Sequence, residues 1–301
     1  MQASISPQKN FFTRLRIPGW TRHSSILLGA FFLTCGMILY FWWPLAKEVL
    51  ATVNWEGEWW KTMDWLLIGI FGFMTLTILY GADLKRDLRI ILVGAIGGLV
   101  IETWGTQTNL WHYFTAERPP LWIIPAWPIA SLSIDRITRF LSSGISRIKR
   151  RTGWNFNPTL TQVLYWLVFS AFFLSMLQFT APTLHKSMTL MALTMVGFLI
   201  LTPGEHGYAI LVFMAGTSLG LFLEVWGTTR QCWTYYTLQT PPFFAILAHG
   251  MAALAFWRGG RLVQAIWNRI KGTLPGSWSI KISPKETEKS SDNLQTQGNS
   301  S

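Results

Sequence analysis

Two glutamates stand inside long apolar segments of this chain, and the same aromatic pattern follows each of them. Glu102 opens the sequence Glu-Thr-Trp-Gly-Thr and Glu224 opens Glu-Val-Trp-Gly-Thr. Nine positions after each glutamate a Trp-x-Tyr triplet begins, with Trp111 and Tyr113 in the first case and Trp233 and Tyr235 in the second. A carboxylate in such a segment indicates a functional site. Indole N–H and phenol O–H groups are donors that could satisfy it, and their rings could stack over a substrate.

Two interpretations of the glutamates remain open. In the first, Glu102 and Glu224 form a paired catalytic site, because a low-dielectric environment favours the neutral acid and equips it to donate a proton. In the second, each carboxylate only braces its own loop by accepting hydrogen bonds from Trp, Tyr or loop amides. His249 is a third catalytic candidate, as an acid, a base or a proton relay, and its alternative is a hydrogen-bonded packing residue.

The two glutamate motifs belong to an internal repeat. Residues 94–139 align with 216–261 at a constant offset of 122, without a gap, and 18 of the 46 positions are identical. Trp104 and Trp226 keep their spacing in both copies, and we expect them, with the Trp-x-Tyr residues, to bind a substrate. Glycines at intervals of four precede each glutamate and share one helix face with it, which predicts close helix packing there; they are Gly94, Gly98, Gly216 and Gly220.

Composition predicts an integral membrane protein that is all-α. Half of the residues are hydrophobic and only 13% are charged, and a bilayer core requires about 20 apolar residues per helix. Eight segments meet this expectation approximately, and they are 26–44, 65–81, 88–104, 121–138, 160–181, 187–203, 208–226 and 241–257.

Basic residues predict the orientation of these spans. The net charge is +11, and with alternating loops only five of the 25 Lys and Arg residues fall on one side: Lys47, Lys61, Arg118, Lys186 and Arg230. The other side is therefore cytoplasmic, and both termini lie there, in a membrane of the bacterial inner or plasma type. Because this topology explains the charge and no independent motif accompanies it, we expect no nucleic-acid partner.

Both glutamates then fall near the outer leaflet, since Glu102 is about 21 Å along its helix from Leu88 at ~1.5 Å per residue.

Four spans in each copy imply two parallel repeats related by an axis along the membrane normal. We expect a cytoplasmic N-terminal arm (1–25), a first four-helix repeat (26–145), a second (146–272) and a disordered tail (273–301), whose composition lacks apolar periodicity.

The glutamate, the Trp-x-Tyr triplet and the prolines that open the next span resemble, at the level of this motif, integral membrane families of carotenoid biosynthesis that include carotenoid hydratases and small-subunit lycopene cyclases. The resemblance covers 102–128 and 224–250. It implies an enzyme that protonates an isoprenoid double bond from a carboxylic acid while aromatic faces stabilise the cation. The Pro-x-Glu-Glu stretch of the cyclases has no counterpart here, where Pro119-Pro120-Leu121 stands.

Three classes of function remain. The first is an enzyme acting on a membrane lipid or isoprenoid, which predicts a lateral opening beside the glutamates. The second is a non-catalytic scaffold or assembly protein, which predicts carboxylates satisfied by loop donors and no cavity. The third is a proton-coupled transporter, which predicts a polar path to the cytoplasmic side. No phosphate loop, nucleophile elbow or metal-ligand spacing occurs, so we expect neither a cofactor nor a metal; the sequence does not identify a protein partner.

Overall fold

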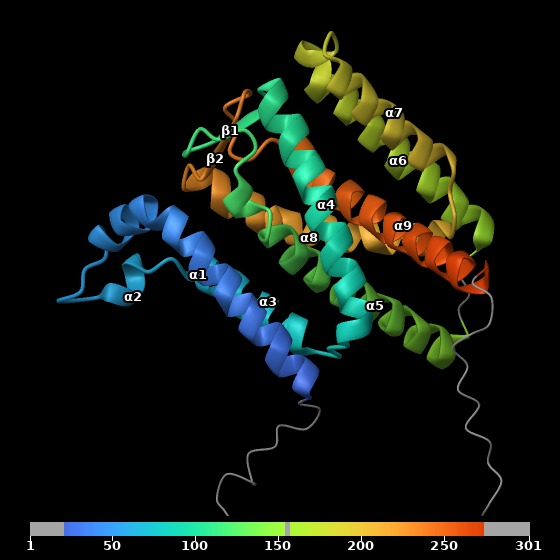
Figure 1. Cartoon of the computed structure of the whole chain (residues 1–301), viewed down its shortest axis with the longest axis horizontal. Coiled ribbons are helices and arrows are strands. Elements are labelled where there is room, and N and C mark those ends of the chain that lie inside the picture. The colour runs from blue at the N-terminus through green and yellow to red at the C-terminus, as the bar shows by residue number, and fades with distance from the viewer. Residues whose placement is uncertain (1–20, 154–156, 274–301) are drawn as a thin grey trace, which may run out of the picture. The chain divides into compact units, whose positions relative to one another are not determined.

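A computed structural model describes residues 21–153 and 157–273 of the chain (Figure 1). It divides into two compact units, 1–261 and 262–301, and of the second unit only the end of the last helix falls in the described ranges. The predicted tail and most of the predicted N-terminal arm lie outside them. In chain order the elements are α1 (Arg22–Ala51), α2 (Trp59–Thr62), α3 (Trp65–Leu79), α4 (Leu84–Thr108), β1 (Trp111–Tyr113), η2 (Leu121–Ile123), α5 (Ala126–Thr152), α6 (Pro158–Thr180), η3 (Ala181–Thr183), α7 (Ser187–Leu201), α8 (His206–Thr229), β2 (Trp233–Tyr235) and α9 (Phe243–Thr273).

The predicted all-α membrane class is confirmed. Five helices of the described chain are long and apolar enough to cross a membrane, and they are α1, α4, α6, α8 and α9. Helices α3 and α7 are also apolar but have 15 residues each, while α5 carries charged residues along its length, from Asp135 to Arg151. The described helices leave many large apolar side chains exposed, such as Leu33 at 77% and Met191 at 73%, as lipid-facing surfaces do.

Several elements of the two halves begin and end at the offset of 122 that relates the sequence motifs. Helix α3 and helix α7 match at both ends, and so do β1 and β2. The loops match as well, because positive φ angles occur at Asn109 and Ala116 in the first half and at Gln231 and Leu238 in the second. The halves differ at the start of their last helix, where α9 runs continuously from Phe243 while η2 and Pro125 precede α5.

Small residues set the distance between the helices that carry the glutamates and their neighbours. A Cβ atom on Gly94 would lie 2.7 Å from Ser131 Oγ on α5, and one on Gly216 would lie 2.6 Å from the His249 carbonyl oxygen on α9. Both contacts are too short for a side chain. Helix α4 therefore packs closely on α5, and α8 packs closely on α9.

A buried ion pair joins the beginning of α4 to α5. Arg136 donates to both oxygens of Asp87, at 2.9 and 2.6 Å, and both residues are almost fully buried. Asp135 lies 3.0 Å from Arg136 and from Arg139. This bidentate geometry fixes α4 and α5 at the end of the bundle opposite the glutamates.

Candidate functional site

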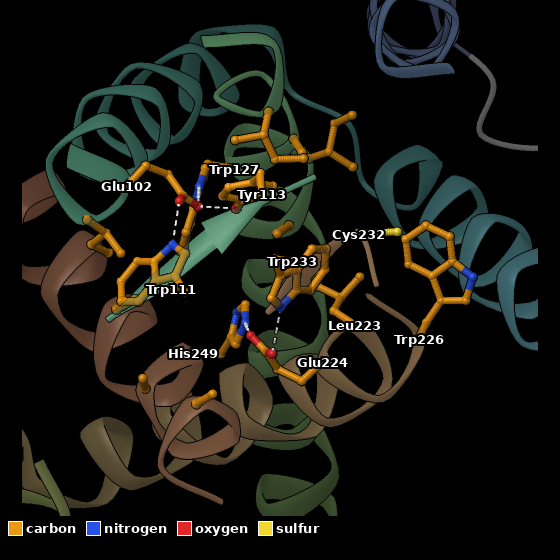
Figure 2. A pocket seen from close by; sticks show the side chains of 18 of the residues that line it. Glu102, Trp111, Tyr113, Trp127, Leu223, Glu224, Trp226, Cys232, Trp233 and His249 are labelled. Atoms are coloured by element: carbon orange, nitrogen blue, oxygen red, sulfur yellow. Dashed lines mark hydrogen bonds and ion pairs between the residues drawn. The ribbon is translucent and has the colours of Figure 1, made fainter. Parts of the chain in front are cut away.

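The carboxylate of Glu102 accepts three hydrogen bonds from aromatic side chains (Figure 2). Trp111 Nε1 donates to Oε2 at 3.0 Å, while Tyr113 OH and Trp127 Nε1 donate to Oε1 at 2.8 and 3.1 Å. Trp111 and Tyr113 come from β1, and Trp127 comes from the first turn of α5. Glu102 itself is only 3% exposed. Among the described residues its carboxyl group therefore bonds to neutral donors and to no cationic side chain.

The carboxylate of Glu224 is held in the same way, with one substitution. Trp233 Nε1 donates to Oε2 at 3.0 Å, and Tyr235 OH donates to Oε1 at 2.9 Å. In place of the tryptophan there is His249, whose Nε2 lies 2.9 Å from Oε1. Glu224 is also 3% exposed. This imidazole is the main chemical difference between the two carboxylate sites.

A two-stranded ribbon brings the two sites together. Strands β1 and β2 pair antiparallel, with Trp111 opposite Tyr235 and Tyr113 opposite Trp233. The ring centroids of these pairs are 6.0 and 5.9 Å apart. Each donor of one glutamate therefore packs against a donor of the other, and the ribbon lies beside the end of α4 (Figure 1).

The third partners of the two carboxyl groups, Trp127 and His249, also contact each other. The rings of Trp127 and His249 are stacked at 5.9 Å with an interplanar angle of 18°. Trp127 was not among the site residues predicted from the sequence. Its number differs by 122 from that of His249, so the repeat alignment carried the signal that could have identified it.

The glycines of the two Trp-Gly-Thr motifs lie inside their helices, one turn from the C-terminal ends. Helix α4 continues past Gly105 to Thr108, and α8 continues past Gly227 to Thr229. A Cβ atom on Gly105 would lie 1.9 Å from the Trp111 ring, and one on Gly227 would lie 2.0 Å from the Trp233 ring. These glycines make room for the indoles that bind the carboxylates.

Trp104 and Trp226 line the same cavity, but they donate elsewhere. Trp104 Nε1 bonds to Thr189 Oγ1 on α7 at 3.3 Å, and Trp226 Nε1 bonds to Asp64 Oδ2 at 3.0 Å. The structure therefore separates these two residues from the carboxylates and places them in the walls.

The cavity has a volume of about 810 Å³ and is lined by both glutamates and His249. Its lining comes from two groups of elements, which we call its arms. Residues of α1, α3 and η2 form the aromatic arm, including Phe31, Phe32, Phe71, Trp42 and Trp122; residues of α6, α7 and α9 form the second arm, including Met176, Met188, Met191, Met195 and Met251. Phe32 on α1 and Met191 on α7 are 58% and 73% exposed. Both arms therefore reach the outer surface of the helices, where lipid lies.

Burial and the neighbouring carboxylates raise the pKa of Tyr113 and of Tyr235 well above the ordinary phenol value. Both phenols therefore keep their protons at neutral pH. Each remains able to donate to its glutamate or, when the glutamate is protonated, to accept from it.

The partners of the two carboxyl groups differ in whether they can accept a hydrogen bond as well as donate one. Indole N–H only donates, so Trp111 and Trp127 require an acceptor on each oxygen of Glu102. Glu224 meets one obligate donor, Trp233, on Oε2, while its Oε1 faces His249 and Tyr235, which can both donate or accept. Oε1 of Glu224 therefore has no partner that is restricted to donating.

In the described ranges no three His, Cys, Asp or Glu side chains gather as a metal site would require. Comparisons of the chain with protein-family models, curated proteins and solved structures found no match.

Proposed function

We propose that this protein is an integral membrane enzyme that protonates a carbon–carbon double bond of a membrane lipid or isoprenoid, with Glu224 as the acid. Eight helices cross the membrane as two parallel four-helix repeats, with both termini in the cytoplasm. The short helices α3 and α7 and the more polar α5 complete the count of eight. The matching bounds of the elements in the two halves support this arrangement.

The observation that carries the proposal is that the two buried carboxylates line one apolar cavity with access to the lipid-facing surface. A carboxylate used only as a brace does not need a cavity of about 810 Å³ beside it. An apolar substrate would enter laterally through either arm and place its double bond near Glu224. Methionine side chains in the second arm adapt to irregular apolar shapes.

In this mechanism the proton of Glu224 Oε1 passes to one carbon of the double bond, and the adjacent carbon becomes cationic. The faces of Trp111, Trp233 and Tyr235 stabilise that charge. Loss of a proton from a neighbouring carbon to the Glu224–His249 pair then completes an isomerisation, or a cyclisation where a second double bond of the same substrate has first attacked the cation to close a ring. Glu102, which lines the same cavity, adds a second polar group near the cation.

A non-catalytic scaffold is the second candidate, and one observation favours it: each glutamate carboxyl group already makes three hydrogen bonds. Transport has less support. Apart from Glu102 and Glu224 no Asp, Glu, Lys or Arg lines the cavity, so the cavity offers no continuous polar path to the other side of the membrane.

The test is mass spectrometry of lipid extracts from cells that lack the protein and are complemented with wild type, Glu224→Gln or His249→Trp. Both variants keep a hydrogen-bonding side chain at their position but remove the transferable proton. The control is Glu205→Gln, an exposed residue paired with Arg261 at 3.0 Å. Membrane levels of all proteins are matched first.

We expect one lipid or isoprenoid species to change on deletion, to return with wild type and the control, and not to return with either site variant. Full complementation by Glu224→Gln would exclude it as the acid. No change in any species on deletion would favour the scaffold.

A further inference from the structure

A second cavity, of about 450 Å³, lies at the outer ends of α1 and α8 and at the beginning of α3, and its lining is polar. Two acids and two bases contribute to it, and they are Glu48, Asp64, Lys61 and Arg230. Thr52, Thr62 and Thr229 add hydroxyl groups. Neither the paired carboxylates nor the repeat motif explains this cavity.

The polar cavity adjoins the aromatic arm of the apolar one. Along α1, Leu45 lines the polar cavity and Trp42 the apolar one; along α8 the corresponding residues are Thr229 and Trp226. At the start of α3, Asp64 lines the first and Leu67 the second. In all three cases the residue that lines the polar cavity and the residue that lines the apolar cavity are three positions apart, which is about 4.5 Å along a helix at ~1.5 Å per residue.

Trp226 and Asp64 form part of the wall between the two cavities. Trp226 Nε1 donates to Asp64 Oδ2 at 3.0 Å, and Arg230 Nε donates to the same oxygen at 3.1 Å. The Trp226 ring also packs against Trp42, with ring centroids 5.2 Å apart. The indole Nε1 of Trp42 is buried, and its one polar neighbour among the described residues is the Cys232 thiol, which is at most a weak acceptor. A buried donor with so weak a partner leaves room for a stronger acceptor at this boundary.

Charge indicates the chemistry of the group that the polar cavity would hold. The two acids and two bases cancel, which suits a zwitterion better than an anion. Glu48 forms no ion pair or hydrogen bond with a described residue, and its carboxylate is available for a cation. Arg230 uses Nε and Nη1 for Asp64 and Thr229, which leaves Nη2 for an anionic oxygen. Lys61 is exposed, and its partner Glu58 is exposed as well.

We propose that these two adjoining cavities bind one zwitterionic phospholipid, with its head in the polar cavity and one acyl chain in the aromatic arm. The ammonium group lies by Glu48, and the phosphate lies by Lys61 and Arg230. An ester carbonyl, which stands between head and chain in such a lipid, accepts from Trp42 Nε1. The binding does not depend on proton transfer at Glu224.

In the second half of the chain, hydrogen-bonded side chains occupy the position equivalent to the polar cavity. Residue 186, at the offset of 122 from Asp64, is Lys186, and its Nζ donates to the Thr108 carbonyl oxygen at 2.8 Å. Beside it Thr183 Oγ1 donates to the Thr180 carbonyl and accepts from Thr189, and these threonines are buried. At this position the second half therefore has hydrogen-bonded side chains, where the first half has a polar cavity.

The experiment is native mass spectrometry of the purified full-length protein with added dioleoyl phosphatidylethanolamine, phosphatidylglycerol or diacylglycerol. Glu48→Gln with Lys61→Gln removes one acid and one base from the polar cavity. The matched control is Lys47→Gln with Glu56→Gln, which removes the same charges from exposed positions outside the lining.

We expect phosphatidylethanolamine to bind wild type and the control at least tenfold more tightly than the Glu48/Lys61 variant. Diacylglycerol should bind all three proteins equally and weakly. Equal binding of phosphatidylethanolamine to all three proteins would overturn the proposal, and so would phosphatidylglycerol binding wild type as tightly as phosphatidylethanolamine does.

Trp42→Phe supplies an independent test because it keeps the aromatic wall and removes the N–H. Ester-linked phosphatidylethanolamine should bind this variant several-fold less tightly than wild type, whereas the ether-linked analogue should bind both equally. An equal loss for both lipids would contradict the proposed hydrogen bond. Because the readout here is lipid binding and not turnover, failure of this proposal and failure of the enzymatic one can be told apart.

Discussion

Trp127 and His249 stack face to face at the centre of the site, and each hydrogen-bonds the glutamate of its own half. The two residues occupy equivalent places in the repeated motif. One presents an N–H that can only donate, and the other presents a nitrogen that can donate or accept. The same backbone arrangement therefore surrounds the two carboxyl groups with partners of different hydrogen-bonding capacity.

This difference predicts unequal effects of removing the two charges. In Glu102→Gln the amide NH₂ must face Trp111 or Trp127 in either orientation, and both are obligate donors. In Glu224→Gln the amide oxygen can accept from Trp233 while NH₂ faces His249 and Tyr235. We expect Glu102→Gln to lose about 1–3 kcal/mol of unfolding free energy and Glu224→Gln to lose clearly less, as measured by denaturant unfolding in detergent.

A second substitution checks the cause of that loss. Trp127→His gives the first site the partner that the second site has, so the double variant Glu102→Gln/Trp127→His should be more stable than Glu102→Gln alone. Equal losses for the two Gln variants, or no recovery in the double variant, would contradict this account of the donors.

Much of the site could be predicted from the sequence, because the repeat showed which residues keep their spacing. The glutamates, the Trp-x-Tyr donors and His249 do converge. The pairing of β1 with β2 could not be predicted, since three-residue strands carry no periodic signal. Trp104 and Trp226 share the same conserved spacing within the chain, yet their N–H groups bond to Thr189 and Asp64. Internal repetition identifies residues kept for packing as well as residues kept for the carboxylates.

The glycines that admit the indoles give the next prediction. A methyl group on Gly105 or Gly227 would overlap the ring of Trp111 or Trp233, at 1.9 and 2.0 Å. We expect Gly105→Ala and Gly227→Ala each to lower the unfolding free energy by about 1–3 kcal/mol, the usual effect of overpacking. Gly144→Ala on α5 is the control because nothing lies within 4 Å of its added Cβ. Its stability should be unchanged or slightly higher, as alanine favours helix; a loss equal to that of Gly105→Ala would show that the indoles are not the cause.

The buried ion pair between α4 and α5 gives a prediction about the other end of the bundle. Arg136→Met leaves the Asp87 carboxylate buried without its bidentate partner, and removal of one member of such a pair costs about 3–5 kcal/mol. Asp87→Leu combined with Arg136→Met removes both charges and should recover much of that loss. The exposed pair of Arg261 and Glu205 is the comparison, and Arg261→Gln should have little effect. Thermal unfolding of the four proteins measures these differences, and a double variant no more stable than Arg136→Met would contradict them.

Cys232 provides a test of packing at the boundary between the two cavities. The residue is 3% exposed, and burial raises the pKa of its thiol to about 12. A thiol with a higher pKa holds less of the reactive thiolate below that pKa, so at pH 8 on the order of one molecule in ten thousand is ionised. In a Cys35→Ser background, which leaves Cys232 as the only cysteine of the chain, we expect a water-soluble maleimide to label the folded protein very slowly and the denatured protein completely. Mass spectrometry of the intact protein follows the reaction. Fast labelling of the folded protein would show that this wall opens to water, and would contradict the tight packing of Trp42, Trp226 and Cys232 on which both the aromatic arm and the lipid site depend.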